Sequence, residues 1–154
     1  MTEPHASNDR SAMSDHTPYA RLGEAGVRKL VNAFYDIMDR SPAANDIRAM
    51  HATDLGPIRS RLTAYLITWM GGPPVYIALQ GSMCLTDAHA QFHIGPKAAE
   101  QWLLCMQQAM QEIDVDDDLK AMLEPAFRRV VSAVQNQHTD NVDKPADHQI
   151  IARG

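Results

Sequence analysis

The sequence has few cysteines and no long apolar run. Its two cysteines, Cys84 and Cys105, form no Cys-x-x-Cys pair, which excludes a zinc ribbon and a thioredoxin-type redox site. No segment approaches the roughly 20 apolar residues that a membrane-spanning helix needs. The first residues also lack the basic and then apolar pattern of a signal peptide. We therefore expect a soluble cytoplasmic protein that has no membrane partner.

Basic residues are also in short supply. The chain has 14 lysines and arginines against 19 acidic residues, a formal net charge of −5. Binding to nucleic acid requires a clustered basic surface, and the sequence contains no such cluster. Its 154 residues suffice for one domain with a full hydrophobic core.

The apolar pattern predicts one all-α domain over residues 18–137. Residues 1–17 and 138–154 are polar and lack apolar periodicity, so we expect a disordered N-terminal lead and a disordered C-terminal tail. Between them the apolar residues recur at helical spacing. The expected elements are a helix ending at Ser41-Pro42, a helical turn over 43–50, a helix from about Asp54 to Gly71, a loop over 75–86, a helix opened by Gly95-Pro96, and a last helix after Asp116 that Pro125 kinks or breaks.

Two histidines, His89 and His93, lie four residues apart just before the helix opened by Pro96. This spacing can bind zinc on one helix face, but the glutamate of a His-Glu-x-x-His motif is absent. Gly95-Pro96 also prevents a helix from continuing through His93. A single histidine on a short turn can instead hold haem iron, if its second ring nitrogen donates to a nearby carbonyl.

Two aromatic residues that can donate hydrogen bonds lie on predicted buried faces. Tyr35 is on the apolar stripe of the first long helix and Trp102 on that of the helix after Pro96. Each is either an ordinary core residue or a donor to a small ligand in a shared cavity. His51 is a third candidate donor, and its alternative is a plain loop residue.

With these residues the chain resembles the group II truncated haemoglobins, from about Leu22 to Val134. The resemblance rests on Trp102, thirteen residues after His89, and on several short motifs. These motifs are Phe34-Tyr35, Ile47-Arg48-Ala49-Met50-His51, Asp54-Leu55, Trp69-Met70-Gly71-Gly72-Pro73, Phe92 and Ile94 after His89, and Trp102-Leu103 with Cys105-Met106. The resemblance implies a two-over-two helical sandwich around non-covalent haem b.

The resemblance also implies a role for each site residue. His89 is the expected iron ligand, Tyr35, His51 and Trp102 the polar residues beside the bound ligand, and Ile58 and Leu62 the apolar distal wall. The other expected haem-lining residues are Tyr65, Leu66, Met70, Tyr76, Phe92, Ile94, Met106 and Phe127.

The sequence departs from the family pattern around the proximal histidine. Thr86-Asp87-Ala88 stands where the family is rich in arginine, Gln91 replaces a proline, and Ala99 replaces an arginine. Because such cations pair with the haem propionates, we consider Lys97, Arg59 and Arg61 as substitutes.

The resemblance predicts reversible binding of dioxygen or another diatomic ligand at five-coordinate iron. It also allows redox activity, either nitric oxide oxidation or peroxide turnover, for which a reductase would be a partner. The alternatives are a haem-free helical interaction domain and a six-coordinate haem protein in which His51 also binds iron. The sequence leaves the oligomeric state open.

Overall fold

The protein is all-helical where the computed structural model describes it, over residues 17–81, 89 and 92–136. No strand occurs in these ranges, which confirms the predicted all-α class. The elements are α2 (Pro18–Arg40), the 3-10 helix η1 (Pro42–Ala44), α3 (Asn45–Ala49), α4 (Gly56–Trp69), α5 (Val75–Gln80), α7 (Pro96–Glu112) and α8 (Asp117–Val134). The predicted lead and tail lie outside the described residues, apart from Thr17.

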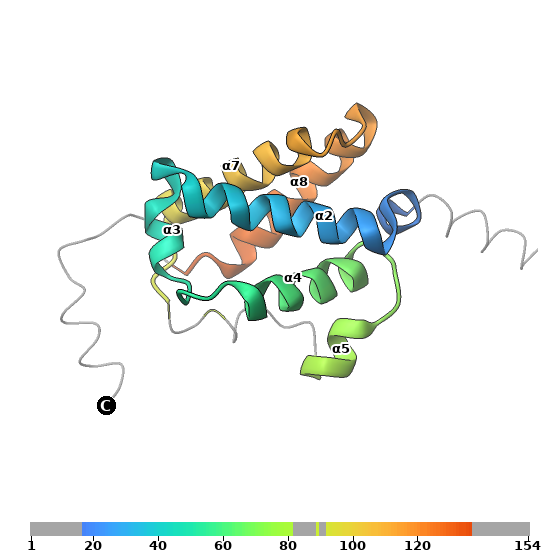
Figure 1. Cartoon of the computed structure of the whole chain (residues 1–154), viewed down its shortest axis with the longest axis horizontal. Coiled ribbons are helices and arrows are strands. Elements are labelled where there is room, and N and C mark those ends of the chain that lie inside the picture. The colour runs from blue at the N-terminus through green and yellow to red at the C-terminus, as the bar shows by residue number, and fades with distance from the viewer. Residues whose placement is uncertain (1–16, 82–88, 90–91, 137–154) are drawn as a thin grey trace, which may run out of the picture.

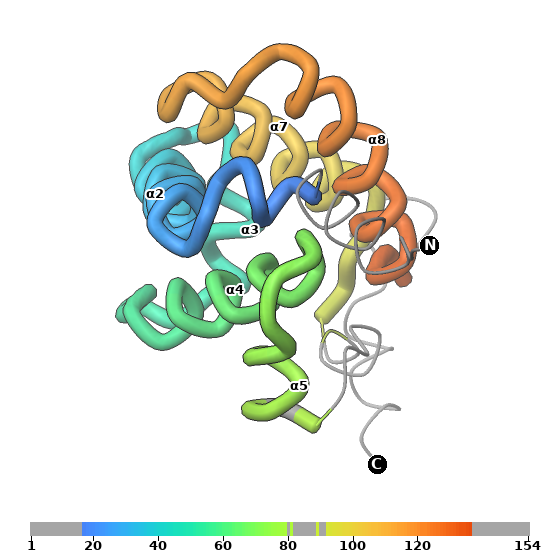
Figure 2. The backbone as a smooth tube through the Cα atoms, turned by 90° about the vertical axis from the view of Figure 1, so that its right-hand side faces the viewer, coloured from blue at the N-terminus to red at the C-terminus, as the bar shows by residue number. Residues whose placement is uncertain are grey.

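The four long helices form two packed layers. α2 packs against both α4 and α7, and α7 packs against α8. Figure 2 shows the α2–α4 pair beside the α7–α8 pair, with the short α3 at the junction and α5 at the periphery. This is the predicted two-over-two arrangement (Figure 1). None of the described helices is long and apolar enough to cross a membrane.

Local sequence signals set the bounds of α2. Its start is capped by Thr17, whose hydroxyl accepts from the amide of Ala20 at 3.0 Å, and Pro18 occupies the first turn. Gly23 interrupts the helical dihedrals with a φ of +70°, a conformation that other residues rarely adopt. The helix ends before Ser41-Pro42, as predicted.

The segment from 75 to 80 corrects the sequence prediction, because it forms α5 rather than a loop. The Thr68 hydroxyl accepts from the Tyr76 amide at 3.0 Å and donates to the Pro73 carbonyl at 3.1 Å, which ties α5 to α4. Tyr76 is buried against Tyr65 with ring centroids 5.1 Å apart. The flanking apolar residues of α5 are exposed, so no periodic apolar stripe marks this helix in the sequence. Residues 82–86 of the predicted loop lie outside the described residues.

The helix α8 runs from Asp117 to Val134, so of the two effects predicted for Pro125, a kink or a break, the break does not occur. A proline inside a helix removes one backbone hydrogen bond, here to the carbonyl of Ala121. Both Ala121 and Pro125 are exposed, so water can reach that carbonyl.

Candidate functional site

A cavity of about 410 Å³ lies where the two helix pairs meet. Its volume falls within the roughly 300–1,000 Å³ that is typical of small-molecule and cofactor sites. The sequence-predicted site residues in its lining are Tyr35, His51, Ile58, Leu62, Tyr65, Leu66, Tyr76, His89, Phe92, Ile94, Trp102 and Phe127. Met70 and Met106 are not in the lining, because both are buried in the hydrophobic core.

Sequence reasoning missed a further part of this lining. The additional lining residues are Ile47, Met50, Ala52, Asp54, Pro57, Trp69, Ala98, Ala99, Val130, Val131 and Val134. Arg61, considered from the sequence as a propionate partner, also lines the cavity. Trp69 stacks on Phe127 with ring centroids 4.9 Å apart. The valines lie on the apolar stripe of α8, and a stripe alone does not separate core residues from cavity residues.

Tyr35 brings a buried phenol to the cavity from the middle of α2. Its side chain is 3% exposed, and its ring packs edge-on against the His51 ring at 5.6 Å. Within the described part of the chain its hydroxyl has no hydrogen-bond partner. Burial raises the pKa of Tyr35 well above its ordinary value, although the charges of Arg61 and Arg59 oppose this shift. The phenol therefore keeps its proton and remains a donor.

Trp102 brings an indole to the same cavity from α7. Its ring contacts Phe34 at a centroid distance of 5.0 Å and Phe127 at 5.7 Å. These contacts orient a flat side chain that has only two rotatable bonds. Its indole N–H also lacks a partner among the residues with described positions. The cavity thus contains two polar hydrogens that form no hydrogen bond with any described residue.

His51 follows the short helix α3 and is held by a hydrogen bond back to it. Its Nδ1 atom lies 2.7 Å from the carbonyl oxygen of Ile47, and a carbonyl can only accept, so Nδ1 carries the proton. Burial lowers the pKa of His51, with smaller contributions from the charges of Arg48 and His89, while the bond to Ile47 opposes this shift. A neutral ring protonated on Nδ1 has a bare Nε2.

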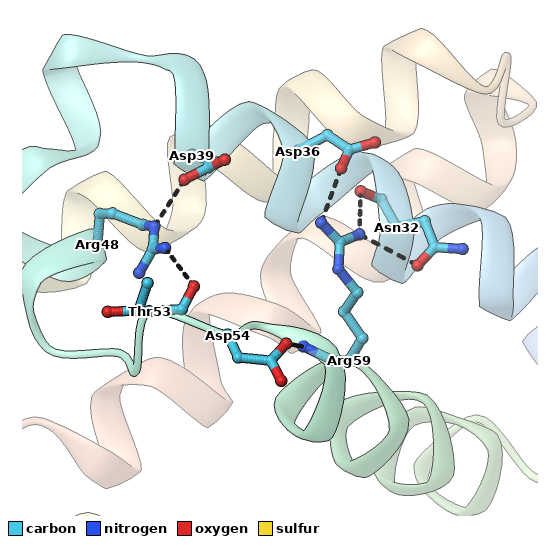
Figure 3. Close-up of polar contacts among 8 residues, drawn as sticks. Asn32, Asp36, Asp39, Arg48, Thr53, Asp54 and Arg59 are labelled. Carbon is cyan, nitrogen blue, oxygen red and sulfur yellow. Dashed lines mark hydrogen bonds and ion pairs between the residues drawn. The ribbon is translucent and has the colours of Figure 1, made fainter.

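The three cations considered as propionate partners differ in whether they already form ion pairs. Arg59 donates to the Asn32 carbonyl and side chain and pairs with Asp36 at 2.8 Å (Figure 3). Lys97 pairs with Asp46 at 3.2 Å. Arg61 lines the cavity and forms no ion pair with any described residue.

On the predicted proximal side, Asn136 fastens the segment that follows His89. Its Nδ2 donates to the Phe92 carbonyl at 2.8 Å, and its Oδ1 accepts from the Ile94 amide at 2.9 Å. The Asn136 amide returns a bond to the Ile94 carbonyl at 2.9 Å. His89 itself is half-buried, with helical backbone. The residues around it, 82–88 and 90–91, lie outside the described residues.

The zinc alternative gains no support from the described residues. Of the two histidines, only His89 lines the cavity, and His93 is exposed. No group of three or more His, Cys, Asp or Glu side chains suited to a metal ion occurs in the described ranges.

Comparison with known proteins identifies the family. The family model described as a bacterial-like globin matches residues 17–136. The chain belongs to this globin family. A curated group 2 truncated haemoglobin of Bacillus subtilis is 28% identical to this globin over 110 residues, which cover 71% of this chain and 81% of that protein.

Solved structures give the same result. The group II 2-on-2 haemoglobin of Agrobacterium tumefaciens has a TM-score of 0.76 and 36% identity, and the match covers 79% of this globin and 95% of that chain. A cold-adapted truncated haemoglobin from Pseudoalteromonas haloplanktis gives 0.76 and 35%, over 79% and 99%. A truncated haemoglobin of Bacillus subtilis described as oxygen-avid gives 0.72 and 26%, over 79% and 100%. The resemblance predicted from the sequence is therefore confirmed.

The residues present fit a haem group, which the family implies as cofactor. The lining is largely apolar and aromatic and includes two histidines, His51 and His89. Haem requires such surroundings and an imidazole as iron ligand. The further observation is the buried Tyr35 hydroxyl, which has no hydrogen-bond partner among the described residues, because an unsatisfied buried donor costs free energy that a bound ligand would remove. Haem-based binding of small ligands is accordingly the activity that family membership brings to this globin.

Proposed function

We propose that this globin binds dioxygen or another diatomic ligand at the iron of non-covalent haem b, with His89 as the iron ligand. The observation that carries the proposal is that two hydrogen-bond donors, the Tyr35 hydroxyl and the Trp102 indole N–H, lie in the cavity that His89 also lines. Neither donor has a partner among the described residues. The oxygen-avid description of one similar structure adds support. In this proposal the protein acts in the cytoplasm.

Haem iron would supply the bond to the diatomic ligand, and the side chains of the cavity would supply the hydrogen bonds and the apolar wall around that ligand. Tyr35 and Trp102 donate hydrogen bonds toward the partial negative charge that a bound ligand acquires. Ile58 and Leu62 from α4 exclude water from the cavity. Each donor lengthens ligand residence, because its bond must break before the ligand leaves.

Arg61 is the best placed cation for a haem propionate. It lines the cavity, whereas Arg59 and Lys97 already pair with Asp36 and Asp46. A guanidinium can bind a carboxylate through two parallel hydrogen bonds. Arg61 would then take over the role of the arginines that this sequence lacks around His89.

Visible absorption of the purified, haem-reconstituted protein tests the proposal. We expect a strong Soret band, a five-coordinate ferrous form, and a shift of the band with carbon monoxide. His89→Ala should lose the haem or change the spectrum grossly, because no other described histidine apart from His51 lines the cavity. His93→Ala, which changes an exposed neighbour, is the matched control and should keep a normal spectrum.

Each alternative has its own outcome in that experiment. A protein with no Soret band after addition of haem would be a haem-free helical domain. A six-coordinate ferrous form that His51→Phe converts to five-coordinate would make His51 a second iron ligand. Consumption of nitric oxide by the dioxygen-loaded protein would indicate a redox enzyme that depends on a reductase. Turnover of peroxide by the ferric protein would indicate a peroxidase-like enzyme.

A further inference from the structure

The function proposed so far assigns no role to Arg48, although its side chain binds the turn that follows His51. Its Nε pairs with Asp39 of α2 at 2.8 Å. Its two terminal nitrogens donate to the carbonyls of Ala52 and Thr53 at 3.0 and 3.1 Å. Figure 3 shows this guanidinium between α2 and the turn, with Asp39 on one side and Thr53 on the other. One side chain thus joins the helix of Tyr35 to the residues directly after His51.

His51 is fixed from the preceding residues as well. Its amide donates to the Arg48 carbonyl at 3.0 Å, and its Nδ1 donates to the Ile47 carbonyl at 2.7 Å. Hydrogen bonds therefore restrain the backbone of His51, its ring and the turn that follows it. Arg48 takes part in two of these three restraints. The contact between the His51 and Tyr35 rings, at 5.6 Å, depends on this arrangement.

The geometry points to Arg48 as a positioning residue of the distal cavity. Arg48 fixes His51 in the orientation in which Nδ1 donates to the Ile47 carbonyl and Nε2 remains a hydrogen-bond acceptor. The inference rests on the proposed function, since it assigns a role at the same site. It gives His51 a part other than the donor expected from the resemblance. Neutral His51 forms a wall beside the ligand and accepts hydrogen bonds, while donation is left to Tyr35 and Trp102.

A lysine cannot replace this arginine. The planar guanidinium reaches a carboxylate and two carbonyls at once, whereas an ammonium is a point charge on a flexible stem. Arg48→Lys keeps the net charge and can keep the contact with Asp39, but it releases at least one of the two carbonyls. The turn that carries His51 then loses its fixed position relative to Tyr35.

The test uses the haem-loaded ferrous protein and five variants, among them His51→Phe alone and combined with Arg48→Lys. We expect Arg48→Lys to broaden or split the stretching band of bound carbon monoxide and to change the ligand dissociation rate by about two- to fivefold, the range of modest coupling energies between neighbours. The same substitution in a His51→Phe background should have a clearly smaller effect, because the residue through which Arg48 acts is gone. Asp39→Asn, which weakens only the ion pair, should shift the band in the same direction but less. Arg40→Lys changes an exposed α2 ion pair with Glu112 and should leave band and rate unchanged.

Nitrogen NMR of His51 gives a readout that a merely structural role would not move. The wild type should show a protonated Nδ1 and a bare Nε2, with or without haem, and Arg48→Lys should weaken this preference. The inference is overturned if Nε2 carries the proton in the wild type. It is also overturned if Arg48→Lys and His51→Phe act additively on the dissociation rate. A missing Soret band would refute the proposed function instead, while the nitrogen spectrum would still decide the state of His51.

Discussion

Asn136 offers a sharp test of how the fold supports the expected iron ligand. It follows α8, and its side chain bonds the Phe92 carbonyl and the Ile94 amide at 2.8 and 2.9 Å. Asn136→Ala removes both bonds and keeps the backbone bond to Ile94. The segment that follows His89 then loses its fastening to α8.

The expected loss follows from the burial of the partners. Each hydrogen bond contributes about 0.5–1.5 kcal/mol net, and a buried donor left without an acceptor adds to the cost. The Ile94 residue is 8% exposed, but Asn136 is exposed, so water can partly replace its side chain. We therefore expect a loss of about 1–2 kcal/mol in the free energy of unfolding, or about 2–8 °C in Tm for a chain of this size.

Thermal unfolding and haem loss together provide the assay. Asn136→Ala should lower Tm and speed the transfer of haem to an excess of haem-free myoglobin. Asn136→Asp keeps the oxygen that accepts from Ile94 but loses the donor to Phe92, so its Tm should fall between the two. Ser132→Ala, on the exposed face of α8, should stay within about 0.5 kcal/mol of the wild type. If Asn136→Ala retains wild-type Tm and haem-loss rate, the fastening contributes nothing and this reasoning is wrong.

Two further predictions concern the single side chains Trp102 and Cys105. Trp102→Phe removes the indole donor but keeps an aromatic ring, so the dioxygen dissociation rate should rise several-fold in a rapid-mixing measurement; an unchanged rate would remove Trp102 from the mechanism. Burial raises the pKa of the Cys105 thiol to about 11, and the nucleophilic form is the thiolate, which then amounts to about one part in a thousand at pH 8. Cys105 should therefore resist alkylation near neutral pH in the folded protein and react on denaturation, as mass spectrometry can show; rapid labelling of the native protein at Cys105 would contradict this.

The sequence predicted those features whose cause is local. Ser41-Pro42 and Gly95-Pro96 mark helix ends through backbone dihedrals, and both ends lie where they were expected. The apolar stripes of α2 and α7 turn Tyr35 and Trp102 inward because helical spacing fixes which residues share a face. Their meeting in one cavity required the packing of α2 on α7, which no local pattern contains.

The features that the sequence did not predict depend on contacts between distant segments. Asn136 reaches the segment after His89 across more than 40 residues. Arg48 reaches back to Asp39 and forward to two carbonyls, and neither partner follows from a periodic pattern. The sequence did not predict α5, because only Tyr76 among its apolar residues is buried and one buried residue forms no periodic pattern.

The hydrogen bonding of the buried hydroxyls in this fold supports the presence of a ligand in the cavity. The buried Thr63 of α4 donates its hydroxyl hydrogen to the Arg59 carbonyl at 2.8 Å, so this hydroxyl costs little to bury. Tyr35 receives no such partner from the described residues, although an unsatisfied buried donor costs about 1–3 kcal/mol. A phenylalanine, as at the neighbouring Phe34, would pack without that cost. The phenol therefore contributes to the protein only when a ligand in the cavity accepts its hydrogen bond, and Tyr35→Phe should stabilise the haem-free protein while weakening the hold on that ligand.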